Sequence, residues 1–376
     1  MSEFAAGPAG RIERVRALMV ERGYDAIVVR DEANLRWLTG VKGVFDYTFE
    51  FPHAAFITAD QCLFHTDSRY LNSFEENTPA DSPWVYDMDE GTIPGWVAGK
   101  IAANKCRVCA VEDDMQINFY QGIQRGLEDR SVACMLPLMH DDIRKMRAIK
   151  DAEEIELMRH AQSITDAAFQ HMLGFIKPGM TEKQVRNELE NFMFANGADS
   201  LAFGSIVASG PNTANPHAVP SDRVIEKGDF VLMDYGAGYC DYRSDMTRTV
   251  VMGEPTQEQL DLYELVRRTH EECVAAIHPG VEGNDIFKLS KKIIGDAGYG
   301  DYYNHGLGHG VGIDIHELPN FNRSMNIIEV GSVVTMEPGV YLPGVGGVRL
   351  EDYGVVTENG YEPFTKTPHD LHIIDC

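Results

Sequence analysis

The chain has 376 residues, of which 44% are hydrophobic and 24% are charged, and its formal net charge is −25 at pH 7. This length exceeds that of a usual single core, so two domains are expected. The excess of negative charge argues against nucleic acid and anionic membranes as partners, since both require a basic face, and no apolar run approaches the roughly 20 residues that span a bilayer.

The sequence pattern of residues 1–147 predicts an α/β domain with its own core. Their start lacks the charged-then-apolar pattern of a secretory signal, so we expect a cytoplasmic protein. An amphipathic helix over Arg11–Glu21 ends at Gly23 and precedes a β-type run over Ala26–Val29. Further apolar strands, AAFIT and RVCAVE, alternate with helical stretches, which is typical of an α/β domain.

The seven cysteines are odd in number and scattered, which suits a reducing compartment better than a disulfide framework. Cys106 and Cys109 form a C-x-x-C, but the segment KCRVCAVE is typical of a strand, in which residues i and i+3 face opposite sides. The sequence has no second such pair to complete a zinc site. We therefore interpret both as core cysteines.

The charged segment Asp141–Asp151 marks the boundary between the two domains. It leads into a long helix whose Asp151 and Glu154 form a D-x-x-E capping pair. We place the boundary near Ala148, which gives an N-terminal domain over 1–147 and a second domain over 148–376.

The second domain contains an internal repeat. The string IKPG, ending at Gly179, returns as IHPG, ending at Gly280, and each copy is followed by a predicted helix, over Thr181–Asn196 and Asp285–Ala297. Strands follow each helix pair. Two copies of such a unit, facing each other, would bring equivalent positions together at a pseudo-twofold axis.

Five metal-type ligands follow in fixed order, in the strings MDYGAGYCDYRSDMTRT, HGLGHGVGIDIHE, TMEPGVY and GGVRLED: Asp234, Asp245, His309, Glu337 and Glu351. Four carboxylates and one imidazole suit a pair of divalent cations. Two cations roughly 3.5–4 Å apart can hold a hydroxide between them and polarise a carbonyl at neutral pH. The sequence therefore predicts a dinuclear metallohydrolase.

Local patterns suggest how these ligands are placed. A hairpin would put Asp234, at the end of FVLMD, opposite Asp245, at the start of DMTRTVV, with Asp241 as a turn residue. His309 lies between two glycines, which would let the backbone come close to an ion. Arg349 lies two residues before Glu351 on a predicted strand and shares its face.

These strings, together with NPHAVPSDR around His217, NLRWLTG at Asn34–Gly40 and TDSRY at Thr66–Tyr70, resemble the pita-bread metallopeptidases. The match covers nearly the whole chain and favours the prolidase (Xaa-Pro dipeptidase) and aminopeptidase P branch. The resemblance implies an α/β N-terminal domain of the creatinase/prolidase type and an α+β pita-bread catalytic domain with an internal pseudo-twofold repeat.

The resemblance also implies roles for the site residues. Asp234 would bind one metal through both oxygens, Asp245 and Glu351 would bridge the two metals, and His309 would be the only histidine ligand. Glu337 would bind one metal and act as general base on the nucleophilic water.

Further residues match positions outside the metal ligands. His316 would stabilise the oxyanion, Arg349 would orient the ligands, and His217 would hold substrate or shuttle a proton. His305 receives no role and is interpreted as structural.

The implied function is hydrolysis of the Xaa-Pro bond in dipeptides, with two divalent ions, Mn²⁺ first and Co²⁺, Fe²⁺ or Zn²⁺ as alternatives, in a homodimer. In many prolidases an arginine close behind the HE-x-P segment grips the carboxylate of the proline. Here Asn320 follows Pro319 and the nearest arginine is Arg323, so an aminopeptidase P acting on longer Xaa-Pro peptides stays open. A metal-dependent lyase or hydrolase of a non-peptide substrate on the same fold also stays open, whereas creatinases and metal-free binding modules lack the five ligands.

Overall fold

The computed structural model describes residues 7–42, 51–88, 91–322 and 326–376. The chain divides into two compact units, Met1–Met146 and Arg147–Cys376, and the predicted boundary after residue 147 lies one residue from this division. Within the described stretches, every helix is too short or too polar to cross a lipid bilayer.

The first unit contains a five-stranded mixed sheet in the order β4-β3-β2-β1-β5, in which β1 and β2 are antiparallel and β1 and β5 are parallel. Its elements are α1 (Gly7–Arg22), β1 (Ala26–Val29), α2 (Glu32–Thr39), β2 (Ala54–Thr58), β3 (Cys62–His65), α3 (Leu71–Asn77), β4 (Val85–Asp87), α4 (Ile93–Ala103), β5 (Cys109–Val111), α5 (Ile117–Asp129) and α6 (Asp142–Arg147).

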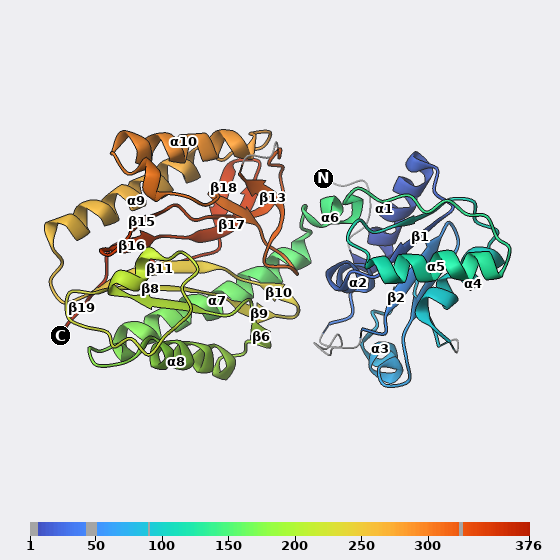
Figure 1. The fold of residues 1–376 in the computed structure, drawn as a ribbon, viewed down its shortest axis with the longest axis horizontal. Coiled ribbons are helices and arrows are strands. Elements are labelled where there is room, and N and C mark those ends of the chain that lie inside the picture. The colour runs from blue at the N-terminus through green and yellow to red at the C-terminus, as the bar shows by residue number, and fades with distance from the viewer. Residues whose placement is uncertain (1–6, 43–50, 89–90, 323–325) are drawn as a thin grey trace. The chain divides into compact units, whose positions relative to one another are not determined.

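The first helix and strand of this unit follow the predicted pattern. Helix α1 buries Ile12, Val15 and Met19 at helical spacing, and the chain leaves it at Gly23, whose φ of 71° suits a residue without a Cβ. Helices α4 and α5 cover one face of the sheet (Figure 1), where their apolar side chains pack on β1 and β2. Cys106 and Cys109 are buried, which confirms them as core cysteines.

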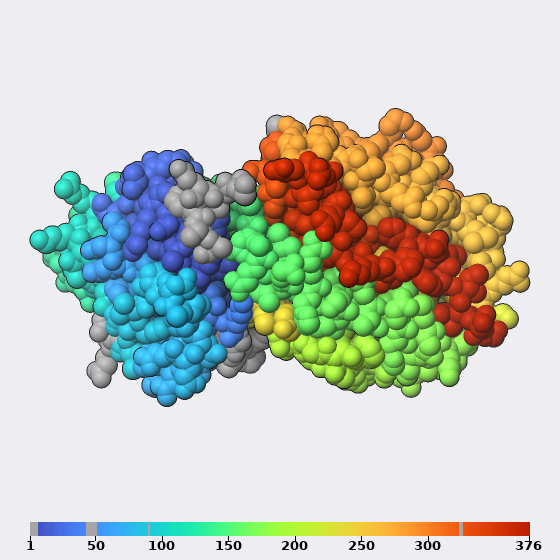
Figure 2. Space-filling view, turned by 180° about the vertical axis from the view of Figure 1, so that it is seen from behind, coloured from blue at the N-terminus to red at the C-terminus, as the bar shows by residue number. Residues whose placement is uncertain are grey.

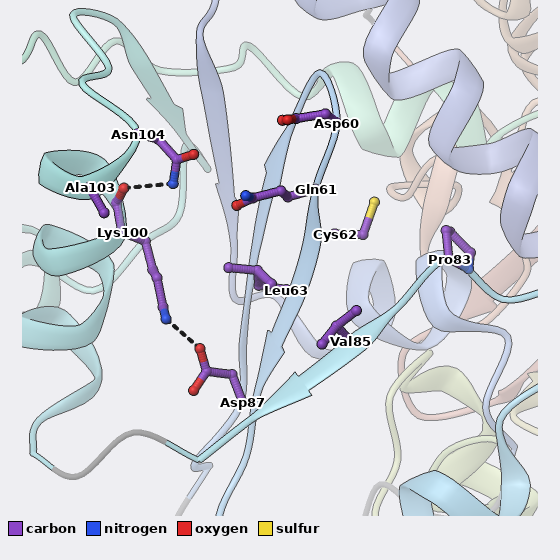
Figure 3. A pocket seen from close by; sticks show the side chains of 10 residues that line it. All are labelled: Asp60, Gln61, Cys62, Leu63, Pro83, Val85, Asp87, Lys100, Ala103 and Asn104. Atoms are coloured by element: carbon purple, nitrogen blue, oxygen red, sulfur yellow. Dashed lines mark hydrogen bonds and ion pairs between the residues drawn. The ribbon is translucent and has the colours of Figure 1, made fainter.

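A groove of about 550 Å³ lies in this unit beside β3, β4 and α4 (Figure 3). Lys100 Nζ lies 2.5 Å from Asp87 Oδ2, and Asn104 Nδ2 donates to the Lys100 carbonyl at 2.9 Å. Burial raises the pKa of the Cys62 thiol to about 11, so this thiol is protonated at pH 7. None of the site residues predicted from the sequence lines this groove.

The second unit contains two main antiparallel sheets, ordered β19-β11-β8-β7, with β19 parallel to β11, and β13-β12-β14-β17-β18. Its elements are α7 (Ala152–Phe175), α8 (Glu182–Ala195), β6 (Ser200–Leu201), β7 (Ile206–Ser209), the 3-10 helix η1 (Gly210–Ala214), β8 (Phe230–Tyr235), β9 (Ala237–Tyr239), β10 (Tyr242–Arg243), β11 (Met246–Met252), α9 (Gln257–Ala275), α10 (Gly283–Asp296), the 3-10 helix η2 (Gly300–Tyr302), β12 (Gly308–Gly310), β13 (Glu317–Phe321), β14 (Val333–Met336), β15 (Gly339–Leu342), β16 (Gly346–Arg349), β17 (Asp352–Thr357), β18 (Gly360–Pro363) and β19 (Ile373–Ile374).

The helices of this unit form two pairs on opposite sides of the sheets (Figure 1). Helices α7 and α8 pack on β7, β8 and β11 in one hydrophobic core. Helices α9 and α10 pack on β14, β15, β16 and β17 in a second core. Each half of the repeat therefore has its own core, and the strands lie between the two helix pairs.

Backbone geometry at equivalent glycines confirms the internal repeat. Gly179 has a φ of 92° and donates to the Ile225 carbonyl, while Gly280 has a φ of 88° and donates to the Ile328 carbonyl. Helix α8 begins at Glu182, one residue after the predicted start, with Thr181 as its N-cap, and α10 begins at Gly283, two residues before the predicted Asp285. The absence of a Cβ lets Gly283 start the helix against β13, since a Cβ there would lie 2.6 Å from the Asn320 carbonyl oxygen.

Candidate metal centre

The first two carboxylates come from the hairpin of β8 and β11. Asp234 lies near the end of β8 and pairs with Thr247, so Asp245 lies two residues before the position opposite Asp234. The predicted hairpin is confirmed, but the prediction that the two aspartates face each other directly is wrong. Because side chains alternate along a strand, Asp245 and Thr247 still share the face of Asp234.

The turn beyond these residues sets the register. Cys240 and Asp241 have φ values of 47° and 71° and lie between the paired residues Tyr239 and Tyr242. Two consecutive left-handed residues are the signature of a two-residue hairpin turn. Asp241 is therefore a turn residue, as predicted.

His309 lies between carboxylates from both halves of the repeat. Its Nε2 is 3.6 Å from Asp245 Oδ2 and 3.5 Å from Glu337 Oε1. Asp245, His309 and Glu351 each offer one ligand atom, and these three atoms lie within 4.8 Å of one another. His309 Nδ1 lies 3.0 Å from the Gly310 carbonyl, so Nδ1 carries the proton and Nε2 directs its lone pair at the carboxylates.

The glycines beside His309 have a packing role that the sequence did not predict. A Cβ at Gly308 would lie 2.3 Å from the Thr335 carbonyl oxygen, and one at Gly310 would lie 2.3 Å from the Leu318 carbonyl oxygen. The small residues therefore let the neighbouring strands approach β12, which holds His309 from both sides. The expectation that they let the backbone come close to an ion stays a prediction.

Arg349 connects the ligands to one another. Its guanidinium forms an ion pair with Asp234 and donates to Thr247 Oγ1 at 3.0 Å and to the Tyr341 hydroxyl at 2.9 Å. Thr247 Oγ1 in turn donates to Glu351 Oε2 at 2.7 Å. This buried network fixes the orientation of one ligand from each half of the repeat.

Sequence reasoning missed Thr247 and Tyr341. Thr247 could have been found, because it lies two residues after Asp245 on the same strand and so shares its face. Tyr341 lies on β15 and reaches the site only through the β15–β16 hairpin, in which it pairs with Gly347. No local pattern marks it.

The ligand cluster is electrostatically unfavourable on its own. Burial raises the pKa of Asp245 well above its ordinary value, and the neighbouring Glu351, Asp234 and Glu337 raise it further. Burial and Asp234 raise the pKa of Glu337 to about 8, against the opposing effect of Arg349. Like charges held together out of water require compensating positive charge.

The donor set fits a pair of divalent cations. Asp234 Oδ1 is buried and has no hydrogen-bond partner among the described residues, although Asp234 Oδ2 is paired with Arg349. A buried carboxylate oxygen without a donor is costly unless something else binds it. Oxygen ligands with a single imidazole suit Mn²⁺, Co²⁺, Fe²⁺ and Zn²⁺.

A buried carboxylate positions the loop that carries His217. Glu182 Oε1 accepts hydrogen bonds from the amide and hydroxyl of Ser209 and from Asn212, and Glu182 Oε2 accepts from the amide and hydroxyl of Ser221. Arg349 also donates to the Pro216 carbonyl at 3.2 Å. His217 itself is exposed, so the loop places a solvent-accessible imidazole next to the Arg349 network.

The other two histidines of this region have different environments. The His316 ring lies with its centroid 4.3 Å from that of His309. His316 is exposed at the surface, but the surrounding protein removes part of its hydration, and this desolvation, followed by the charge of His217, lowers its pKa. His305 Nδ1 lies 2.6 Å from the Gly306 carbonyl and Nε2 lies 2.9 Å from the Tyr341 hydroxyl. Burial lowers the pKa of His305 to about 3, so it is a neutral partner of Tyr341.

A second buried ion-pair cluster holds the segment after His316. Glu317 forms an ion pair with Arg147 and lies 2.9 Å from Lys150 Nζ. Burial alone would raise the pKa of Glu317, but Arg147 and Lys150 lower it to about 2. Arg323 lies outside the described residues, so its predicted contact with substrate stays a prediction.

We expect Glu317→Gln to destabilise the protein by about 3–5 kcal/mol at pH 7, because it removes the buried carboxylate charge that Arg147 and Lys150 share, although Arg147 keeps its ion pair with Asp314. An unfolded glutamate has a pKa of about 4.3, and the pKa in the folded protein is about 2. The contribution of Glu317 is thus present above pH ~4.3 and is lost as the pH falls towards 2. Urea unfolding midpoints of wild type and variant should therefore converge in acid.

Glu264→Gln is the matched control, since Glu264 pairs with Arg267 on the surface of α9. Exposed ion pairs contribute about 0–1 kcal/mol, so this variant should unfold close to wild type. Equal midpoints for Glu317→Gln and wild type at pH 7 would contradict the role given to Glu317.

Comparison with known proteins identifies the family of this protein. Residues 156–358 match the model of "Metallopeptidase family M24", and residues 11–149 match that of the "Creatinase/Prolidase N-terminal domain". The chain belongs to metallopeptidase family M24, with a creatinase/prolidase N-terminal α/β domain and a pita-bread catalytic domain. This confirms the resemblance and the fold class predicted from the sequence, and the family implies a dinuclear metal site.

Individual relatives define the type of peptidase more closely. The chain is 37% identical over 97% of its length to the whole of an uncharacterized peptidase, YqhT, of Bacillus subtilis. Among solved structures it resembles an Xaa-Pro dipeptidase from Bacillus anthracis, with a TM-score of 0.89 and 36% identity over 98% of this chain and 100% of that one. It also resembles an X-Pro aminopeptidase from Thermotoga maritima, with a TM-score of 0.85 and 30% identity over 97% of this chain and 100% of that one. The protein is an Xaa-Pro dipeptidase-like metallopeptidase.

Proposed function

We propose that this protein hydrolyses the Xaa-Pro bond of dipeptides. The observation that carries the proposal is the convergence of Asp245, His309 and Glu351 within 4.8 Å, with Glu337 3.5 Å from His309. A pair of divalent cations bound there would lower the pKa of water and polarise the scissile carbonyl. Mn²⁺ is the cation we propose, since most of the ligand atoms are carboxylate oxygens.

In this proposal, the residues around the centre transfer the proton, bind the substrate and hold the metal ligands in place. Glu337 is proposed to take the proton of the attacking water and to pass it to the leaving proline nitrogen. His316 and His217 face solvent and offer N–H groups to the substrate, with His316 directed at the developing oxyanion. Arg349 keeps Asp234 and Thr247 in place, and Thr247 keeps Glu351 in place.

A substrate panel tests the proposal. Gly-Pro and Ala-Pro are expected to be cleaved with the highest kcat/KM, followed by Xaa-Pro-Xaa tripeptides, while dipeptides without proline are expected to be poor substrates. Faster cleavage of tripeptides would replace the dipeptidase proposal with an aminopeptidase P, an alternative that the likeness to an X-Pro aminopeptidase supports. Failure to cleave any proline peptide would favour a non-peptide substrate.

A variant of Arg323 tests why dipeptides would be preferred over longer peptides. If it pairs with the free carboxylate of the proline, a charge-assisted contact of roughly 1.5–3 kcal/mol is lost in Arg323→Ala. Activity on Gly-Pro should then fall by roughly 10–150-fold, whereas tripeptides, whose proline carboxyl is amidated, should be much less affected. Equal losses on both substrates would make Arg323 a structural residue.

The homodimer implied by the resemblance stays a separate prediction.

A further inference from the structure

A second group of metal-type ligands lies in the catalytic unit, apart from the site described above. His270 on α9, Asp352 at the start of β17 and His369 in the C-terminal segment each offer one ligand atom, and these atoms lie within 4.8 Å of one another. Figure 2 shows the C-terminal segment, in red, lying against α9, in yellow-orange. The Tyr263 hydroxyl on α9 donates to the His369 carbonyl at 3.1 Å and fixes this contact.

The distances suit one cation held by three ligands. His369 Nε2 lies 2.6 Å from Asp352 Oδ2, and His270 Nε2 lies 3.7 Å from the same oxygen. Metal–ligand bonds of about 2.0–2.1 Å in tetrahedral geometry separate the ligand atoms by about 3.3 Å. The observed distances lie on either side of this value, so small side-chain rotations would complete the geometry.

The environment of His270 suits a bound cation. This residue is 1% exposed, and neither ring nitrogen has a hydrogen-bond partner among the described residues. A buried imidazole without partners is costly, and a cation on Nε2 would give it one. His369 is 27% exposed at its side chain, which leaves a path for an ion from solvent.

The Asp352 carboxylate is held in an orientation that suits metal binding. Arg248 donates to Asp352 Oδ1 at 2.7 Å and to the carbonyls of Thr367 and Pro368 at 2.6 and 3.1 Å. Oδ2 is thereby left facing both histidines. An outer-shell hydrogen bond of this kind orients ligands in known metal sites.

The group is separate from the dinuclear centre. Thr247 and Glu351 carry the ligand network of that centre, and Arg248 and Asp352 are their next residues along the chain. Because successive side chains of an extended chain point to opposite faces, this second pair faces away from it.

We propose that His270, Asp352 and His369 form a structural site for a single divalent cation of the Zn²⁺ or Co²⁺ type. Two imidazoles and one carboxylate favour these borderline ions over Mg²⁺ or Ca²⁺. The bound cation would tie the segment that carries His369 to α9 and β17. The alternative, a hydrogen-bonded network of Arg248, Asp352 and His369 with no metal, is an outcome of the test below.

The test uses the full chain with the dinuclear centre disabled by Asp245→Asn and His309→Ala. This background is titrated with Zn²⁺ alone against a chromophoric chelator. We expect about one equivalent of Zn²⁺ to bind, and His369→Ala in the same background to weaken binding by more than about tenfold. The control is His278→Ala, an exposed histidine in the turn after α9, which should leave binding unchanged.

Two results would overturn the proposal: no Zn²⁺ binding by the background chain, or equal binding with and without His369. If His369→Ala does not fold, the Co²⁺ spectrum of the background chain decides instead. Visible bands of a tetrahedral site with nitrogen ligands are expected, and their absence would mean that the residues form only a hydrogen-bonded network. The outcome does not depend on peptidase activity, so it is independent of the proposed function.

Discussion

Replacing Glu337 with glutamine is expected to lower kcat/KM for Ala-Pro by more than about 10²-fold while the fold is retained. The side-chain volume is nearly unchanged, but the negative charge and the basicity are lost. Glu337 Oε1 lies 3.5 Å from His309 Nε2 and the residue directly follows β14, so the amide would occupy the same place without being able to accept a proton. Steady-state kinetics at saturating Mn²⁺ measure the loss.

Two controls separate a catalytic loss from a structural one. Glu358→Gln changes an exposed glutamate in the turn between β17 and β18 and should leave kinetics unchanged. Elemental analysis of Glu337→Gln shows whether the variant still holds its metal. Near-normal kinetics for a fully metallated Glu337→Gln would mean that another residue activates the water.

Features that depend on local sequence could be predicted well. The β1 strand over Ala26–Val29 and the end of α1 before Gly23 follow from apolar spacing and a glycine. The internal repeat could be predicted from Gly179 and Gly280. Both residues have a positive φ, which favours glycine, so the sequence has a glycine at each of the two equivalent positions. The convergence of Asp245, His309 and Glu351 could be predicted because these residues occur in short, characteristic strings.

Features that depend on strand register and long-range contacts could not be predicted. The β8–β11 pairing places Thr247 rather than Asp245 opposite Asp234, because the Cys240–Asp241 turn fixes the count of residues between them. Glu182 acts on a loop that comes about 30 residues later, and nothing near it in the sequence marks that contact.

The same limit applies to the second cluster of metal-type ligands. His270, Asp352 and His369 come from three separate segments and share no motif. Only the packing of the C-terminal segment on α9 brings them together. A sequence search for ligand spacing would miss this cluster.

Exhaustive chelation is expected to abolish peptidase activity, and Mn²⁺ or Co²⁺ is expected to restore it. Without cations, Asp245, Glu337 and Glu351 are buried together with raised pKa values, so the empty centre opposes folding. At a free ion concentration of 100 times Kd, each bound ion stabilises the folded chain by about 2.7 kcal/mol. For a unit of this size, that corresponds to a rise in Tm of about 5–11 °C.

Asp245→Asn separates the dinuclear centre from non-specific ion binding, because it removes a ligand that lies 3.6 Å from His309. In this variant Mn²⁺ should neither restore activity nor raise Tm to the wild-type extent. Full turnover by the wild-type chain after chelation, with the absence of metal established by elemental analysis, would contradict the dinuclear hydrolase. Recovery of activity without a rise in Tm would contradict a buried site, since an ion held by these residues must stabilise the state that holds it.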